Sequence, residues 1–360
     1  MRARASILVT LTGALFAAAA AGAAPELPDY RPQQQVTGVL RSWGDNHMAA
    51  LLKNWEQGFH QYQPGVYFVD NLRGTASGPF GLFENVADFA LMGREIFTYE
   101  YYGIYRRSLM VPVEIAVATG SYDVPQKSFA LTVFVHRDNP LARLTLAQLD
   151  GIFGDARTGG WLGLNWNREA ARGAEKNIRT WGQLGLTGAW ADLPIHLYGP
   201  PGVYPGGQTF FQRRVMGGAD TWAEGLREYA DPAKMMADLS SDPQGIAYTG
   251  IGYRTALTKP LAVAETDAGP FVEPTRASVA SRDYPLSRLV YLCFAPDQPS
   301  GDPADPRVDP KLREFLRYIL SRQGQADVAR EGDYLPLTPA VASEQLRQID
   351  QGAALAPTRD

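Results

Sequence analysis

Residues 66–97 constrain the fold most strongly, because their pattern is that of a complete β-α-β unit. An alternating run of β-forming residues at 66–69 ends in a turn of glycine, serine and threonine at 73–78. A short segment with apolar residues at helical spacing follows, and residues 87–92 form a second strand-like run. Strand, turn, helix and strand in this order predict an α/β sheet.

The turn at residues 73–78 also predicts a place for an anion. It precedes a helix, whose first turn presents unpaired backbone N–H groups and the positive end of the helix dipole. Both features favour a negatively charged group close to the backbone.

A second strand, turn and helix precede this unit. Residues 36–40 read as a strand and residues 41–46 as a turn with several capping side chains. The helix that follows is amphipathic, with these apolar residues at helical spacing: Met48, Leu51, Leu52, Trp55 and Phe59. Because ligands of open α/β sheets bind at the carboxyl ends of the strands, the two turns predict one shared ligand site.

The second half of the chain also has strand-like runs that lead through turns into helices. Residues 131–136 and 195–198 read as strands, and the latter lead into a glycine- and proline-rich turn at 199–209 before another helix. Residues 161–190 are rich in tryptophan, glycine and arginine, and their loose pattern predicts loop with short helices. A glycine-rich turn therefore precedes a helix in each half of the chain.

The N-terminus has the pattern of a secretory signal peptide. Arg2 and Arg4 precede an apolar run at 7–21, and small residues at 21–24 offer a cleavage site. A membrane anchor is the alternative, but the run is shorter than the ~20 residues that span a bilayer. We expect a periplasmic protein whose mature chain does not insert into the membrane.

Composition and charge argue against several classes of binding partner and several kinds of site. The formal charge falls from −4 to −6 without Arg2 and Arg4, which argues against nucleic acid and anionic membrane surfaces as partners. The single cysteine, Cys293, cannot form an internal disulfide or a thiol-based metal site. The four histidines show no metal-ligand spacing, and no nucleophile or phosphate-loop motif is present. The sequence thus predicts no catalytic residue, no metal and no cofactor.

Several short segments are each weak evidence for a protein family, but their order along the chain is specific. They are residues 74–78, 85–89, 138–141, 144–154, 245–248, 284–288, 309–310, 314–316, 320–321, 324–325 and 334–337. In this order they resemble the PstS-like branch of the type 2 periplasmic binding proteins, the phosphate-binding proteins of ABC transporters.

The resemblance implies an α/β fold of two lobes, each a mixed sheet flanked by helices, with the ligand in the cleft between them. The expected segments are a signal peptide at 1–24, a linker at 25–35, lobe 1 at 36–127 plus 264–351, lobe 2 at 128–263 and a tail at 352–360. The resemblance also implies phosphate or a related small oxyanion as ligand, cleft closure around it, a monomer, and an inner-membrane ABC permease as partner.

The phosphate contacts of the family can be transferred only position by position. Asn46 stands in the turn before the first helix, and Thr75 matches a hydroxyl of the glycine-rich turn. The aspartate that accepts a hydrogen bond from protonated phosphate falls on Gly93. The arginine and the Ser-Gly-Thr turn of the second lobe fall on residues 201–209, which contain neither arginine nor serine.

These departures predict weaker phosphate binding, since a charge-assisted hydrogen bond to a buried oxyanion is worth about 1.5–3 kcal/mol. Arg73 and Arg94, beside the first-lobe turns, are candidates for the missing charge, and solvated surface arginines are the alternative. The predicted ligand-binding residues are Ser42, Asn46, Arg73, Thr75, Ser77, Arg94, Gly206, Gly207, Gln208 and Thr209.

The chain is therefore predicted to be a binding protein and not an enzyme. Gly93 and the proline-rich second-lobe turn leave one alternative open. In that alternative the fold is kept, but the ligand has changed or the protein serves as a protein–protein adaptor.

Overall fold

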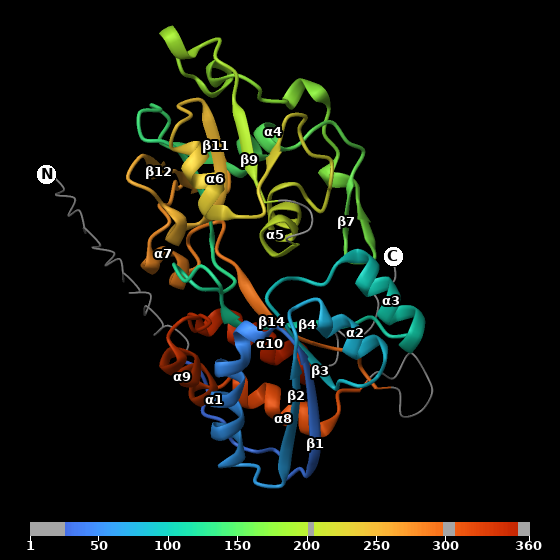
Figure 1. Cartoon of the computed structure of the whole chain (residues 1–360). Helices are drawn as coiled ribbons and strands as arrows, with labels where there is room; N and C mark the ends of the chain where they lie inside the picture. Colours follow the sequence, from blue (N-terminus) through green and yellow to red (C-terminus); the bar gives the residue numbers. More distant parts are fainter. Residues whose placement is uncertain (1–25, 201–204, 298–306, 352–360) are drawn as a thin grey trace, which may run out of the picture.

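Figure 1 shows a computed structural model of the chain, which describes residues 26–200, 205–297 and 307–351. The predicted signal peptide, the predicted tail at 352–360 and part of the second-lobe turn lie outside these residues. Within the described ranges, no helix has both the length and the apolar character needed to cross a bilayer.

The first sheet has the strand order β2-β1-β3-β14-β4. Its strands are β1 (Gly38–Gly44), β2 (Val66–Leu72), β3 (Phe89–Met92), β4 (Val113–Thr119) and β14 (Leu289–Phe294). β1 pairs in parallel with β2 and β3, whereas β14 runs antiparallel to β3 and β4. The predicted β-α-β unit is confirmed as β2, α2 (Ser77–Phe83) and β3, with β1 inserted between its two strands.

The predicted turn at residues 41–46 is wrong for residues 41–44, because β1 continues to Gly44. Every residue of β1 pairs with β2, so the backbone stays extended. Asp88 adds support from the loop before β3: its carboxylate accepts hydrogen bonds from the backbone N of Arg41 at 2.7 Å and from the guanidinium at 2.6 Å.

Helices cover both faces of the first sheet (Figure 1). One face is covered by α1 (Ala49–His60), α8 (Pro310–Ile319), α9 (Arg322–Glu331) and α10 (Pro339–Gln351). The other face is covered by α2 and α3 (Thr98–Ser108). The larger core contains Phe315, whose ring lies 5.2 Å from Phe59, 4.9 Å from Phe68 and 5.7 Å from Phe89.

The second sheet has the order β10-β9-β11-β5-β12 and is also mixed. Its strands are β5 (Leu131–His136), β9 (His196–Gly199), β10 (Arg227–Glu228), β11 (Gly245–Gly250) and β12 (Thr258–Pro260). Helices α4 (Leu146–Phe153) and α5 (Pro205–Val215) pack on one face, and α6 (Pro232–Leu239) packs on the other.

Shorter elements complete the described chain. They are β6 (Arg143–Thr145), β13 (Ala262–Ala264), α7 (Arg276–Ser281), and the 3-10 helices η1 (Asn46–Met48), η2 (Arg168–Ala170), η3 (Ala174–Lys176), η4 (Trp181–Leu184), η5 (Gly188–Trp190) and η6 (Ile251–Tyr253). Residues 161–190 contain the predicted short helices, but they also contain a hairpin that the sequence did not indicate. Its strands are β7 (Gly160–Leu162) and β8 (Asn165–Asn167), with Trp161 paired to Trp166.

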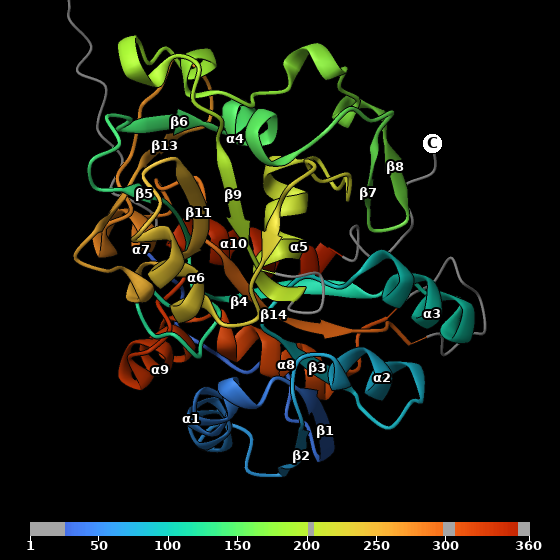
Figure 2. The ribbon, with the colours of Figure 1, turned by 45° about the horizontal axis from the view of Figure 1, so that its top comes forward.

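The α/β class with two mixed, helix-flanked sheets is confirmed, and Figure 2 shows the two sheets with their helices in separate halves. The chain passes from the first sheet to the second between β4 and β5 and returns between β13 and β14. Some residues assigned to lobe 1 by sequence pack in the core of the second sheet: Val272, Val279, Tyr284, Leu286 and Leu335. The exact lobe boundaries remain a prediction.

We expect the Phe315→Ala variant to lose about 3–5 kcal/mol in free energy of unfolding, because it removes a ring from a buried aromatic cluster. Urea denaturation of the mature chain measures this loss. Phe80→Ala is the control, since the Phe80 side chain is 67% exposed and its removal should change stability by no more than about 0.5 kcal/mol. Equal losses in the two variants would contradict the assignment of Phe315 to the core.

Candidate functional site

Three side-chain oxygens converge on Gly93, the residue that follows β3. A Cβ atom placed on Gly93 would lie 2.4 Å from Oδ2 of Asp45, 2.5 Å from Oγ of Ser128 and 3.3 Å from Oγ1 of Thr75. The three residues come from the turn after β1, the segment before β5 and the turn after β2. The absence of a side chain at Gly93 therefore leaves room for a carboxylate and two hydroxyls from elsewhere in the chain.

Asp45 is fixed at this place by its position at the end of β1. It is 3% exposed, and its backbone N donates to the carbonyl oxygen of Leu91 at 2.9 Å. Its Oδ1 accepts a hydrogen bond from the backbone N of His47 at 2.9 Å and so caps η1. Capping holds one carboxylate oxygen while the other lies toward Gly93.

The two hydroxyls are tied to the backbone of Gly93. Ser128 Oγ donates to the Gly93 carbonyl oxygen at 2.6 Å. The Gly93 N–H donates to Thr75 Oγ1 at a longer 3.4 Å. Thr75 can therefore rotate its own hydroxyl hydrogen toward another acceptor.

Arg288 supplies a buried cation beside these groups. It is 3% exposed, and its Nη2 donates to the same Gly93 carbonyl oxygen at 2.9 Å. Nη2 also lies 3.3 Å from the place of a Cβ on Gly206, in the first turn of α5. Burial lowers the pKa of the Arg288 guanidinium, and nearby acidic groups, Glu95 first among them, oppose this effect.

The Arg288 guanidinium is only partly satisfied by the protein. Its Nε is buried and has no hydrogen-bond partner among the described residues. Its positive charge therefore lies in a desolvated place, and one of its donors has no partner among the described residues.

We call this set of residues the cradle: Asp45, Thr75, Gly93, Ser128, Arg288 and Gly206. It combines a carboxylate acceptor, the Thr75 hydroxyl, which can donate, the Ser128 hydroxyl, whose hydrogen is held by the Gly93 carbonyl oxygen, and one cation. Such a set suits a small oxyanion that keeps at least one proton, since the carboxylate can accept a hydrogen bond from its O–H group while Thr75 and Arg288 donate to its bare oxygens. No group of three or more potential metal-ligating His, Cys, Asp or Glu side chains occurs among the described residues.

Some of the sequence-predicted residues lie in or next to the cradle. Thr75 and Gly206 belong to it, and Gln208 and Thr209 line a pocket further along α5. Asn46 is exposed, with its Oδ1 3.9 Å from the place of a Cβ on Gly74.

Three more predicted residues lie near the cradle without pointing at Gly93. Ser77 Oγ donates to the carbonyl oxygen of Gly74 at 2.8 Å. Gly207 lies against the Leu131 side chain, and Arg73 is exposed and bonds to Asn71 at 2.8 Å.

The remaining two predicted residues use their polar groups elsewhere. Ser42 lies inside β1 and donates to Asp70 Oδ1 at 2.7 Å. Arg94 is buried but forms a two-pronged ion pair with Glu100 at 2.8 and 2.7 Å, and its guanidinium lies 3.9 Å from the ring centre of Phe97. Arg94 is therefore neither a solvated arginine nor a cation of the cradle.

Sequence reasoning missed Asp45, Ser128 and Arg288. Asp45 lies in the turn at residues 41–46, which contains several capping side chains. Arg288 ends the segment 284–288, which contributes to the family resemblance. Both residues were therefore weakly indicated by the sequence. Ser128 was not, because a serine between two strands is ordinary.

Comparisons with known proteins agree with this architecture. A family model described as the PBP superfamily domain matches residues 32–323. The phosphate-binding protein PstS of Pseudomonas aeruginosa is 30% identical over 350 residues, which cover 97% of this chain and 98% of that protein. Protein SphX of Synechococcus elongatus is 26% identical over 242 residues, which cover 65% of this chain and 62% of that protein.

Solved structures show the same fold. An ABC-type phosphate transport receptor from Vibrio cholerae superposes with a TM-score of 0.51 at 19% identity, over 82% of this chain and 99% of that chain. PstS from Borrelia burgdorferi gives a TM-score of 0.50 at 15% identity, over 83% of this chain and 98% of that chain.

Gly93→Ala should lower the free energy of unfolding by about 1–3 kcal/mol, because the new methyl group would overlap the Asp45 carboxylate and the Ser128 hydroxyl. Thermal or urea unfolding measures the change. Gly103→Ala in α3 is the control: its Cβ would meet only Phe83, at 3.9 Å, so the variant should be neutral or up to about 1 kcal/mol more stable. A Gly93→Ala protein as stable as the parent would mean that the three oxygens are not held there.

Proposed function

This chain belongs to the PBP superfamily, in its PstS-like group, and on that premise we propose that it binds phosphate between its two sheets. The observation that carries the proposal is the Asp45 carboxylate, which occupies the space beside Gly93 where the family has an aspartate side chain. The carboxylate that is absent at position 93 is thus supplied by Asp45.

Phosphate fits the cradle by its protonation state. At neutral pH phosphate keeps at least one proton, so its O–H group can donate a hydrogen bond to Asp45, and its bare oxygens can accept hydrogen bonds from Thr75 and Arg288. Sulfate carries no proton at this pH, so an oxygen facing Asp45 would be repelled. The cradle should therefore prefer phosphate to sulfate.

Arg288 takes the role of the missing second-lobe arginine. Its guanidinium lies between Gly93 on the first sheet and Gly206 on the second-sheet side. A charge-assisted hydrogen bond from a buried arginine is worth about 1.5–3 kcal/mol, so one such bond restores much of the affinity that the sequence suggested was lost.

The cellular role follows from the family and from the N-terminal sequence. We propose that the chain is exported by its signal peptide, acts as a monomer in the periplasm, and delivers phosphate to an ABC permease of the inner membrane. The apolar run at residues 7–21 and the names of the relatives, one a phosphate-binding protein and one an ABC-type phosphate transport receptor, support this role. The predicted lobes would close around the ligand.

Calorimetric titration of the mature chain with phosphate and with sulfate tests the ligand. We expect phosphate to bind and sulfate to bind more weakly. Thermal stabilisation by another solute, with no response to millimolar phosphate, would instead support the alternative of a changed ligand.

Asp45→Asn should weaken phosphate binding by about 10- to 150-fold and lower the ratio of phosphate to sulfate affinity, because an amide can donate to a bare oxygen. Asn still caps η1, so the fold should survive. Asp267→Asn, a change at an exposed aspartate, serves as control and should leave both affinities unchanged. An unaltered selectivity in Asp45→Asn would remove Asp45 from the site.

Arg288→Met should weaken phosphate binding by a similar factor of about 10 to 150, because it removes the cation and keeps most of the side-chain volume. The matched control is Arg107→Met at an exposed arginine of α3. Unfolding curves of both variants separate loss of binding from loss of fold. Full phosphate affinity in a folded Arg288→Met protein would contradict the assigned role.

A further inference from the structure

The guanidinium of Arg213 connects the two halves of the molecule, each of which is built on one of the five-stranded sheets. Arg213 lies on α5, which packs on the second sheet, yet its Nη2 donates to the carbonyl oxygen of Ile96 in the first-sheet half at 2.9 Å. Its Nη1 lies 3.5 Å from Oε2 of Glu114 on β4 of the first sheet. The side chains of Arg213 and Glu114 are 22% and 14% exposed, so water and salt screen this ion pair less than a surface pair.

Glu114 is held in place to receive this cation. Its Oε1 accepts a hydrogen bond from the backbone N of Ile96 at 2.6 Å, and its Oε2 accepts one from the hydroxyl of Tyr101. Both donors belong to the first-sheet half, so they fix the carboxylate there. Burial raises the pKa of Glu114, and the positive charge of Arg213 is the strongest opposing effect. The carboxylate thus relies on a cation from the other half of the molecule.

Arg213 in turn relies on acidic groups of the first-sheet half. Burial acts to lower the pKa of its guanidinium, but Glu114 and Glu95 act against burial, and the pKa is raised above its usual value. Glu95 precedes Ile96 directly in the chain, so both carboxylates lie in the half that α5 faces. The charges on the two sides of this contact are therefore complementary.

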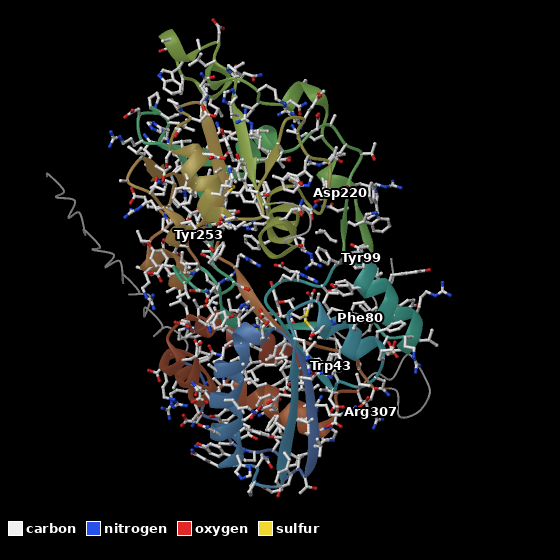
Figure 3. All side chains as sticks on the ribbon, viewed as in Figure 1. Trp43, Phe80, Tyr99, Asp220, Tyr253 and Arg307 are labelled. Carbon is white, nitrogen blue, oxygen red and sulfur yellow. The ribbon has the colours of Figure 1, made fainter. Side chains whose placement is uncertain are left out.

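Arg213 lies beside open space between the halves. It lines a pocket of about 380 Å³ together with Glu95, and a pocket of about 930 Å³ together with Ile96. Tyr99 and Asp220, both labelled in Figure 3, mark the first-sheet and second-sheet walls of the larger pocket. Arg213 therefore reaches the first-sheet half across a hollow part of the molecule.

A second contact between the halves lies next to this ion pair. In the β7–β8 turn, the place of a Cβ on Gly163 is 3.6 Å from the ring of Tyr101, whose hydroxyl binds Glu114. The next residue, Leu164, packs against the apolar cluster under α2 and α3. The second-sheet half thus contacts Tyr101 and Glu114 through two elements, the hairpin and α5.

The helix that carries Arg213 also reaches the cradle. Gly206 lies in the first turn of α5, seven residues before Arg213, which is about 10 Å along the axis at the usual helical rise. Because one continuous helix contains both residues, a displacement of one end displaces the other. Bonds that fix Arg213 to the first-sheet half therefore also fix Gly206 relative to Asp45 and Thr75.

We propose that the Arg213–Glu114 pair is a latch that holds the two halves together and positions α5 for anion binding in the cradle. The inference rests on the proposed function, since Arg213 would act on bound phosphate through α5. Separation of the halves would leave the largely buried Glu114 carboxylate without its cation, which is unfavourable. Phosphate then binds more tightly, because a larger fraction of the molecules is already in the binding-competent arrangement.

Phosphate binding to the mature chain and to its Arg213→Met and Glu114→Gln variants tests the latch. We expect each variant to raise the dissociation constant about 5- to 150-fold, the usual range of coupling between linked equilibria, mainly through faster dissociation. Stopped-flow tryptophan fluorescence measures the rates. Small-angle X-ray scattering of phosphate-free Arg213→Met should give a larger radius of gyration than that of the parent, because its halves separate more often.

Further variants identify the ion pair as the cause. The double variant of Arg213→Met and Glu114→Gln should bind phosphate no more weakly than Arg213→Met alone, because both changes remove one interaction. Arg213→Lys keeps the positive charge and should recover part of the affinity. Arg137→Met is the matched control, at a side chain that is 57% exposed after β5, and should change neither affinity nor radius. Thermal unfolding of each variant checks its fold.

The outcomes separate this inference from the proposed function. A folded Arg213→Met protein that keeps either the phosphate affinity or the radius of gyration of the parent overturns the latch and leaves the phosphate site standing. Losses of affinity that add in the double variant overturn the pairing with Glu114. If the parent binds no phosphate, the proposed function fails, whereas a larger radius in Arg213→Met still supports the latch.

Discussion

The carbonyl oxygen of Gly93 accepts hydrogen bonds from Ser128 Oγ at 2.6 Å and from Arg288 Nη2 at 2.9 Å. Gly93 directly follows strand β3 of the first sheet, whereas Ser128 and Arg288 belong to the two segments that connect the sheets. One backbone oxygen thus joins both connecting segments to the same strand end. Since Arg288 is buried, breaking its bond would leave a desolvated donor unpaired, which costs about 1–3 kcal/mol or more. The geometry of the cradle depends on this shared acceptor.

The balance of charge around this oxygen explains how a glycine can stand where a carboxylate is expected. With no side chain at Gly93, the Asp45 carboxylate fits against the backbone, at the place where we propose that the ligand binds. Burial lowers the pKa of the Arg288 guanidinium, and Glu95 and Asp45 oppose this effect, so the cation has acidic neighbours before any ligand binds. An anion with one proton adds bonds to both kinds of group without leaving a charge unopposed.

The local pattern of apolar residues predicted much of the fold. The spacing of apolar residues predicted β2, α2, β3 and α1, because a buried strand or helix face repeats every second or every third to fourth residue. The same reasoning predicted the end of β1 four residues before its actual end, and it did not predict the β7–β8 hairpin. In β1 the polar residues Arg41 and Ser42 look like a turn, but Asp88 and Asp70 bind them within the sheet. The hairpin has only three residues in each strand, too few to show a period.

Residue identity and local order were enough to establish the α/β class, the glycine-rich turns and the lack of a carboxylate at position 93. Which charges form the cradle, in contrast, depends on how distant segments meet in the folded chain. Arg94 is adjacent to Gly93 in sequence, yet Glu100, six residues away, holds its guanidinium. Arg288, 195 residues from Gly93, reaches the carbonyl oxygen instead. A charged side chain pairs with an oppositely charged or polar group that lies close to it in space. Sequence periodicity contains no information about distances between segments that meet only after folding.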